Sequence, residues 1–82
     1  MNIEVGQIWR LNSGTSTYII TKVYSWQTFG KKHTGVELER LGQDDPDFLR
    51  TWKEHVTVLE ENYYQVTDKD EIGWLLLQNE AA

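Results

Sequence analysis

The chain has 82 residues, with 8 Lys and Arg, 13 Asp and Glu, 2 His and no Cys, and its formal net charge is −5. This length predicts a single domain, and a hydrophobic share of 39% with 6 Gly argues against intrinsic disorder. The absence of Cys excludes a disulfide scaffold and a zinc–thiolate site. No apolar run approaches the roughly 18 residues of a membrane span, and the first residues lack the basic and apolar regions of a signal peptide, so we expect a cytoplasmic protein.

Charge is distributed unevenly along the chain. Residues 1–42 carry five basic and three acidic side chains, or +2, whereas residues 43–82 carry three basic and ten acidic ones, or −7. An acidic chain has few cations to neutralise phosphates, so tight binding to duplex nucleic acid is not expected. The acids favour a protein partner with a basic surface, unless they serve only to keep a small domain soluble.

Several segments have the residue types of β-strands. Residues 7–11 alternate in side-chain character before an Asn-Ser-Gly turn, and residues 15–25 are rich in Thr, Tyr, Ile and Val, which favour a pleated surface. Val36 and Leu38 alternate with two Glu, as in a strand with one buried face. The expected strands are Gln7–Leu11, Thr15–Ser25, Thr34–Leu41, Phe48–Lys53 and Val56–Leu59, with Asn62–Val66 as a last strand or an extended connector.

Two segments between the expected strands have the residue types of connections. The segment Trp26–His33 contains Gly30 and two lysines and predicts an exposed hairpin connection, and Gly42–Asp47 predicts a polar loop. Because side chains alternate along a strand, the second strand should have two distinct faces. We expect one face to consist of Thr17, Ile19, Thr21 and Val23, and the other of Tyr18, Ile20, Lys22 and Tyr24.

Near the end of the chain, the spacing of the apolar residues changes from that of a strand to that of a helix. Asp68 and Glu71 have the spacing of a capping box, and acidic side chains are favoured at a helix N-terminus. A stripe at helical spacing follows, formed by Ile72, Leu75, Leu76 and Asn79. We therefore expect a helix from about Asp68 to Asn79, so that the domain consists of a β part over 1–66, a helical segment over 67–79 and a tail over 80–82.

This predicted helix has apolar residues on both sides. Trp74 and Leu77 fall opposite the stripe that would dock on the sheet. A large apolar pair left in water marks an interface, either with a partner or with a second copy in a homodimer. The other interpretation is a helix that the β part and its loops cover on both faces.

The order of these features resembles SH3-like small barrels. A Gly6-x-x-Trp9-Arg10 strand comes first, followed by spaced β-branched residues, the late Trp52 and the pair Tyr63 and Tyr64. The resemblance covers roughly residues 5–66 and is strongest to short bacterial and phage proteins that open with a Gly-x-x-Trp-Arg strand. It implies a mainly β (α+β) fold, a five- to six-stranded antiparallel SH3-like small barrel with one C-terminal α-helix. The chain also resembles phage accessory proteins, which often bind and inhibit a host protein in the host cytoplasm.

Three acids surround the only proline and could coordinate a cation, namely Asp44, Asp45 and Asp47. An EF-hand loop that began at Asp45 would need Gly at its sixth and Glu at its twelfth position, where the chain has Arg50 and Val56. The sequence therefore predicts a solvated acidic turn without a metal ion. These acids remain candidates for contact with a basic partner.

No motif indicates an enzyme. His33 and His55 are 22 residues apart, and neither belongs to a nucleophile or zinc motif, so we interpret them as surface or hydrogen-bonded histidines. A Gly-x-Ser-x-Gly elbow and a Gly-x-x-x-x-Gly-Lys phosphate loop are both absent from the sequence. We expect no catalysis and no cofactor, although paired carboxylates that converge in space stay open as a third hypothesis.

The segment Trp26–His33 is the best candidate for a small ligand. It combines the aromatic Trp26 and Phe29 with Lys31, Lys32 and His33. Bases stack on aromatic faces while lysines hold phosphates, so a nucleotide, a single nucleic-acid strand or an acidic peptide could bind there. Alternatively, Trp26 folds back onto the barrel, and the lysines protect a sheet edge from aggregation.

The leading hypothesis is a non-catalytic module that binds another protein through acidic and aromatic surfaces. Exposed aromatics near the loops and the last strand of SH3-like barrels form a peptide groove. The residues proposed for this contact are Trp74, Leu77, Tyr24, Tyr63 and Tyr64, with Asp44, Asp45 and Asp47. Binding of a nucleotide or single-stranded nucleic acid at Trp26–His33 is the alternative.

Overall fold

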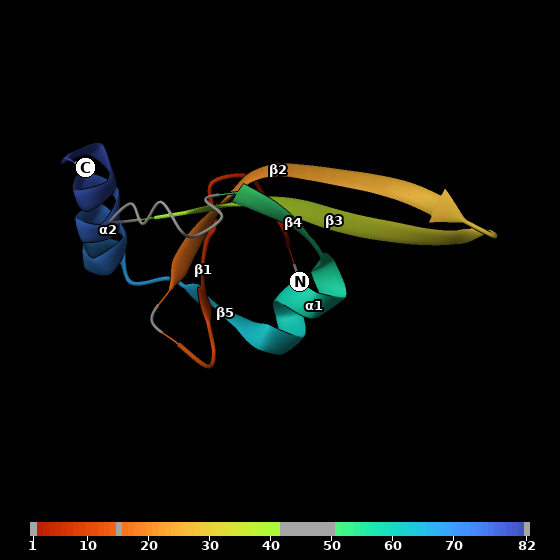
Figure 1. Ribbon diagram of the computed structural model, residues 1–82, viewed down its shortest axis with the longest axis horizontal. Coiled ribbons are helices and arrows are strands. Elements are labelled where there is room, and N and C mark those ends of the chain that lie inside the picture. The colour runs from red at the N-terminus through yellow and green to blue at the C-terminus, as the bar shows by residue number, and fades with distance from the viewer. Residues whose placement is uncertain (1, 15, 42–50, 82) are drawn as a thin grey trace.

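The structure, a computed structural model, describes residues 2–14, 16–41 and 51–81. Five strands and two helices follow one another along these residues (Figure 1). They are β1 (Ile8–Leu11), β2 (Thr17–Thr28), β3 (Lys31–Arg40), β4 (Thr51–His55), α1 (Val56–Asn62), β5 (Tyr63–Val66) and α2 (Lys69–Ala81). The predicted mainly β fold is confirmed, whereas the prediction of one helix is wrong because α1 precedes the last strand.

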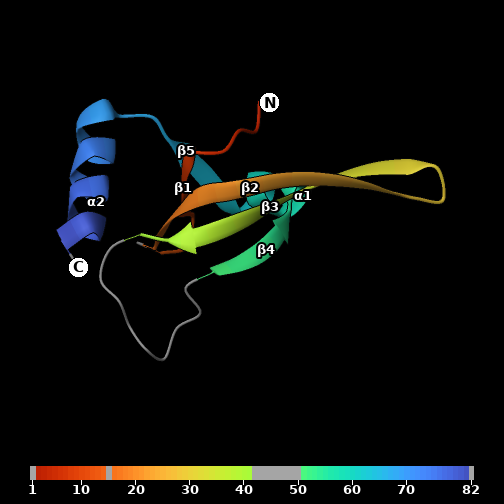
Figure 2. The same ribbon diagram turned by 90° about the horizontal axis from the view of Figure 1, so that it is seen from above.

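The strands form one antiparallel sheet in the order β4-β3-β2-β1-β5. Strand β1 lies between β2 and β5, with Ile8 opposite both Ile19 and Val66. The sheet is open, because β4 and β5 do not pair with each other in the described residues. Helix α2 lies at one end of the long axis, and the β2–β3 hairpin projects at the other (Figures 1 and 2).

Residues from one helix pack against each face of the sheet. The main core lies on the face that we call the core face, where the rings of Trp52 and Tyr63 approach Tyr18 edge-on, with centroids 4.4 and 5.8 Å away. The buried members of this core are Trp9, Tyr18, Ile20, Val36, Leu38, Leu59 and Tyr63, of which Leu59 comes from α1. On the opposite face, which we call the outer face, Ile72 and Leu75 of α2 contact a smaller cluster of Ile8, Leu41 and Val66.

A bulge in β2 changes which side chains lie on which face. The register with β3 shifts between Ile20 and Lys22, so that Thr21 is an extra residue. Beyond it, Val23 packs against the main core together with Ile20. The predicted division of β2 into two faces is therefore wrong after Ile20, because one inserted residue transfers Lys22 and Tyr24 to the outer face.

The β2–β3 hairpin is longer than the sequence predicted. The segment Trp26–His33 is not a loop, since only Phe29 and Gly30 lie between the two strands. Their φ angles of +50° and +80° are the left-handed values of a two-residue type I′ hairpin turn. Strand β4 begins at Thr51, and the predicted loop Gly42–Asp47, together with residues 48–50 of the predicted fourth strand, lies outside the described residues.

The segment Val56–Leu59 was expected to be a strand, but it belongs to helix α1. Its β-branched residues each disfavour a helix by less than about 0.7 kcal/mol relative to Ala. Against this, Leu59 is fully buried, which contributes about 1.5–3 kcal/mol, and the backbone N–H of Thr57 donates to the His55 side chain in an N-cap worth about 1 kcal/mol. Tertiary burial and the cap outweigh the local propensity.

The predicted cap of α2 is confirmed in part. Oδ1 of Asp68 accepts hydrogen bonds from the backbone N–H groups of Asp70 and Glu71, at 2.9 and 3.2 Å. The Glu71 carboxylate does not complete a capping box, because it forms an ion pair with Arg10. Ile72 and Leu75 face the sheet as predicted, whereas Leu76 is exposed. Neither helix of the described residues has the length and apolar character needed to cross a bilayer.

Candidate functional site

The distal hairpin, which we define as residues 25–34, extends beyond the rest of the sheet (Figures 1 and 2). Strand β4 pairs with β3 only as far as Gly35, so these residues pair with each other alone. Residues 25–32 are all exposed, and His33 and Thr34 are partly buried. The distal hairpin therefore presents both of its faces to solvent and adds nothing to the main core.

Four rings form a continuous group at the base of this hairpin, which we call the aromatic strip: Tyr24, Trp26, His33 and His55. Trp26 stacks on Tyr24 and on His33, with centroid distances of 5.6 and 5.3 Å. The ring of His55, from β4, approaches Trp26 edge-on at 5.7 Å. Ring pairs at these distances are attractive beyond the area they bury, so the strip holds Trp26 in a fixed orientation although 40% of it is exposed.

Gly35 provides the space that the strip occupies. A methyl group on Gly35 would lie 2.9 Å from Cζ3 of Trp26 and 3.0 Å from two ring atoms of Tyr24. Gly35 of β3 is opposite Tyr24 of β2 on one side and His55 of β4 on the other, so it lies between the strands that supply these rings. The absence of a side chain at this position lets the rings of Tyr24 and Trp26 approach the backbone of β3 closely.

The two histidines share one hydrogen bond, with Nδ1 of His33 3.1 Å from Nε2 of His55. The backbone N–H of Thr57 donates to Nδ1 of His55, so that nitrogen carries no proton. The tautomers follow from this network: His55 carries its proton on Nε2 and donates it to His33. The prediction of hydrogen-bonded histidines is confirmed, and both rings serve to connect the strip to the N-terminus of α1.

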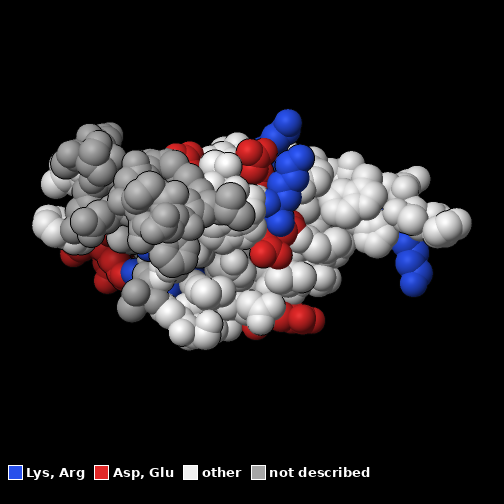
Figure 3. Space-filling model, viewed as in Figure 1, with Lys and Arg blue, Asp and Glu red and all other residues white. Residues whose placement is uncertain are grey.

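Charged side chains flank the strip toward the body of the protein. Lys22, Glu37 and Lys53 are neighbours across the outer face of β2, β3 and β4, and with Tyr24 they line a hollow of about 270 Å³. Nζ of Lys53 lies 5.7 Å from the centroid of Tyr24, within the range of a cation–π contact. Figure 3 shows mixed charge in the middle of this view and only basic charge at the hairpin end.

Helix α2 carries a second apolar surface at the opposite end of the molecule (Figure 1). Trp74 is 60% exposed and Leu77 59% exposed, beside the less exposed Leu76. Of the two interpretations of this helix, the exposure of Trp74 and Leu77 fits the first, since within the described residues the side of α2 with Ile72 and Leu75 is the one that packs against the sheet.

The adjacent tyrosines have different environments. Tyr63 is 7% exposed and belongs to the main core, so the prediction that it forms a binding surface is wrong. Burial raises the pKa of its phenol, and the nearby Glu54 carboxylate raises it further. Tyr64 is 46% exposed as proposed, and its hydroxyl accepts a hydrogen bond from Arg10.

Arg10 connects α2 to the sheet. Its guanidinium donates to Glu71, to the Tyr64 hydroxyl at 3.3 Å and to Oγ1 of Thr17 at 3.1 Å. The bonds to Glu71 and then to Tyr64 raise the pKa of Arg10 further above its already high value. Tyr64 is therefore part of a structural contact as well as a surface residue. The other candidates for a basic partner, Asp44, Asp45 and Asp47, lie outside the described residues.

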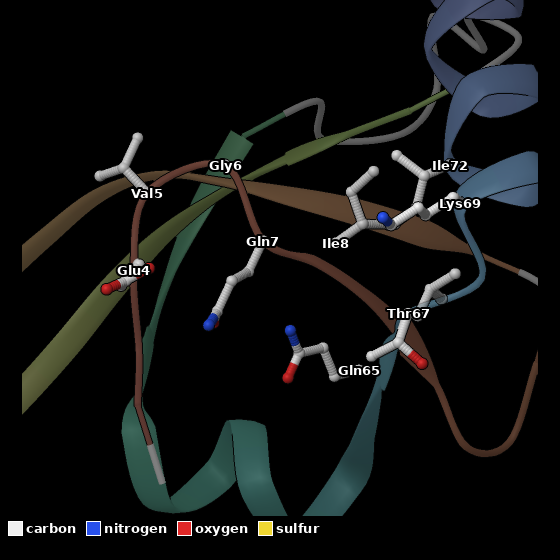
Figure 4. Close-up of a pocket in the computed structure, with 10 residues that line it drawn as sticks. Glu4, Val5, Gly6, Gln7, Ile8, Gln65, Thr67, Lys69 and Ile72 are labelled. Carbon is white, nitrogen blue, oxygen red and sulfur yellow. The ribbon is translucent and has the colours of Figure 1, made fainter.

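A groove of about 440 Å³ that the sequence did not indicate separates the N-terminal segment from β5 and the start of α2. The amides of Gln7 and Gln65 point toward each other in it (Figure 4). The Gln7 amide is committed to the backbone oxygen of Asn2 and to the indole N–H of Trp9. Glu4 is the one acid among its lining residues, so this groove does not contain the carboxylate pair that the third hypothesis needs.

Within 2–14, 16–41 and 51–81, no three His, Cys, Asp or Glu side chains lie together as metal ligands. Comparison of the chain with protein-family models, with curated proteins and with solved structures finds no match. The arrangement of the described side chains thus provides the argument for function.

Proposed function

We propose that this chain is a non-catalytic protein-binding module whose main contact surface is the aromatic strip with the distal hairpin. The observation that carries this proposal is the projection of residues 25–34 beyond the sheet, with ordered rings on one face and no part in the core. Because this segment contributes nothing to the core, its side chains are available for contact with another molecule.

The strip has the properties of a binding hot spot. Trp and Tyr are enriched among the residues that contribute most to binding, particularly where they are held in a fixed orientation. The stack on Tyr24 and His33 and the contact with His55 already restrict the Trp26 ring. Less side-chain entropy is therefore lost on binding than for a free Trp, which costs about 0.5–1.5 kcal/mol when it is immobilised.

Binding of a nucleotide or a single nucleic-acid strand is the second candidate function, and the geometry favours it less than protein binding. Trp26 already stacks on Tyr24 and His33, so less of its surface is open to a base than in an unpaired ring. Lys31 and Lys32 contribute +2, and without them the net charge of −5 becomes −7, which opposes the approach of phosphates. The alternative now depends on Phe29 and these two lysines.

The finer fold that we propose is an open SH3-like small barrel. Its support is that Trp9, Ile20 and Leu38, from three strands, share one core with Leu59 and Tyr63. The resemblance to phage accessory proteins adds a prediction about role, in which the module occludes a host protein and its acids contact a basic patch.

The exposed Trp74 and Leu77 support a second surface, through which we propose contact with a further partner or with a second copy of the chain. Light scattering of the pure protein tests the dimer: a mass of twice 9.6 kDa that falls to the monomer mass in Trp74→Ala would support it.

Two exposed tryptophans offer a matched test of the main surface. The full chain and its Trp26→Ala and Trp74→Ala variants would be used to capture proteins from nuclease-treated extract of the source organism. The partner would then be purified for calorimetry with each variant. We expect Trp26→Ala to weaken the binary complex at least tenfold and Trp74→Ala to change it less than threefold. Equal affinity of Trp26→Ala and the unmodified chain would refute the proposal, and capture that nuclease abolishes would favour the nucleic-acid alternative.

A further inference from the structure

The tip of the hairpin combines an unfavourable backbone with a fully exposed ring. Phe29 has φ +50°, in the left-handed region where a Cβ is disfavoured and where type I′ turns usually have Asn, Asp or Gly. Its side chain is as exposed as in an extended chain, with a relative accessibility of 103%. Packing within the chain therefore does not compensate for the backbone strain.

Strain of this kind is informative when it coincides with an exposed chemical group. Asn at position 29 would fit the turn better and would remove an aromatic ring from water. The sequence has Phe instead, in the turn that joins β2 to β3. This turn is at the projecting end of the hairpin (Figure 2). An outlier without a structural benefit supports an inference about function.

The charges around Phe29 restrict the chemistry of its partner. Lys31 is opposite Thr28 and Lys32 is opposite Gln27, so the two lysines start on opposite faces of the hairpin. The sequence has no acidic residue between Lys22 and Glu37. The tip is thus one apolar ring with a cation on each face, which complements an apolar pocket with carboxylates at its rim.

We propose that Phe29 is an anchor that inserts into an apolar, carboxylate-rimmed pocket of the protein partner, where Lys31 and Lys32 pair with the rim. This inference rests on the proposed function and names the chemistry of the partner. Three residues along the strand separate Phe29 from Trp26 of the aromatic strip, or about 10 Å at the usual rise per strand residue, so the tip can enter a pocket while the strip contacts its edge.

A membrane fits these observations less well than a protein pocket. One ring and two lysines provide a single weak anchor, whereas stable attachment requires two independent signals. The remaining net charge of −7, obtained when the two lysines are removed from −5, is repelled by an anionic surface. A pocket in a protein, by contrast, removes the whole ring from water.

The test begins with the stability of the tip. Urea unfolding of the full chain and of Phe29→Asn would be followed by far-UV circular dichroism. We expect the midpoint of Phe29→Asn to be higher, because Asn adopts left-handed φ more readily. A lower midpoint would show that Phe29 supports the fold and would overturn the proposal.

Contact would be tested with p-benzoylphenylalanine in place of Phe29, photocrosslinked in cells of the source organism, and with calorimetry of the purified crosslinked protein. We expect affinity to fall at least tenfold in Phe29→Asn and less than threefold in Phe29→Leu. Reversal of Lys31 and Lys32 to Glu should weaken binding most at low salt. Absence of a crosslinked protein, or unchanged affinity of Phe29→Asn, would overturn the proposal that Phe29 is an anchor.

Two further arms separate this inference from the proposed function and from other ligands. If Trp26→Ala loses the partner while Phe29→Asn retains it, the strip is the contact surface and the anchor is wrong; if neither variant changes the affinity, both proposals fail. Vesicles of phosphatidylcholine with phosphatidylserine and a 20-nucleotide poly(dT) strand serve as probes. Binding to either one that Phe29→Asn abolishes would overturn the protein pocket.

Discussion

The two halves of the β2–β3 hairpin contain the same strands but differ in what keeps them paired. In the half near the body, Ile20, Val36 and Leu38 are at most 1% exposed and lie in the main core. In the distal hairpin, residues 25–32 are all exposed, and ring contacts together with cross-strand hydrogen bonds maintain the pairing. The comparison separates residues that stabilise the fold from residues that are free to contribute to binding.

Substitution of two tryptophans in the same sheet should give the largest difference in the free energy of unfolding. Trp9 is 1% exposed, so Trp9→Ala leaves a large cavity and should lower the free energy of unfolding by about 3–5 kcal/mol. Trp26→Ala removes contacts from one side of an exposed strip and should lower it by no more than about 1.5 kcal/mol. Urea unfolding by circular dichroism measures both. Equal losses would mean that the distal hairpin is part of the same cooperative core, contrary to our comparison.

Features that depend on local pattern could be predicted from the sequence. Alternation identified Val36 and Leu38 as buried, the position of Asp68 identified the cap of α2, and helical spacing placed Trp74 on the side of α2 opposite the residues that face the sheet. Features that depend on the register between strands could not be predicted from the sequence. The bulge after Ile20 has no local signature, and one extra residue reverses the faces of the rest of β2.

The sequence indicated several residues of the candidate site but not how they are arranged in space. The sequence grouped Trp26, Lys31 and His33 as a loop, because Gly30 and the lysines are typical of connections. The contact between His33 and His55 requires the pairing of β3 with β4, which composition does not provide. The one available signal was Gly35 in an otherwise regular strand, which indicates a close approach to the backbone.

Gly35→Ala tests whether the strip depends on that approach. The new methyl group would lie 2.9 Å from Trp26, so the rings must move, and we expect a loss of about 1–3 kcal/mol in the free energy of unfolding. Near-UV circular dichroism should report the lost ring packing. Gly14→Ala is the matched control, since a methyl group there has no atom within 4 Å. An unchanged near-UV spectrum in Gly35→Ala would mean that the strip does not need the glycine.

His55 lies between the strip and α1, and two substitutions separate its roles. His55→Ala removes the acceptor for the Thr57 N–H and should lower the free energy of unfolding by about 1 kcal/mol. His55→Asn loses the ring contact with Trp26 but keeps a side-chain acceptor, so it should recover most of this loss. Similar stability of the two variants would assign the effect to the strip and not to the cap.

The smallest expected effect concerns Tyr63 and appears only at alkaline pH. Burial, and then the Glu54 carboxylate, raise the pKa of Tyr63, so the neutral phenol is favoured in the folded state. The stability that this shift contributes is complete below the unfolded value of about pH 10 and is lost as the pH rises through the higher folded pKa. The urea midpoint of the unmodified chain should therefore fall more steeply above pH 10 than that of Tyr63→Phe, which keeps the ring but cannot ionise. Parallel pH profiles of the two proteins would mean that the pKa of Tyr63 is the same in the folded and unfolded states. The ring would then be as well solvated as an exposed one, contrary to its 7% exposure.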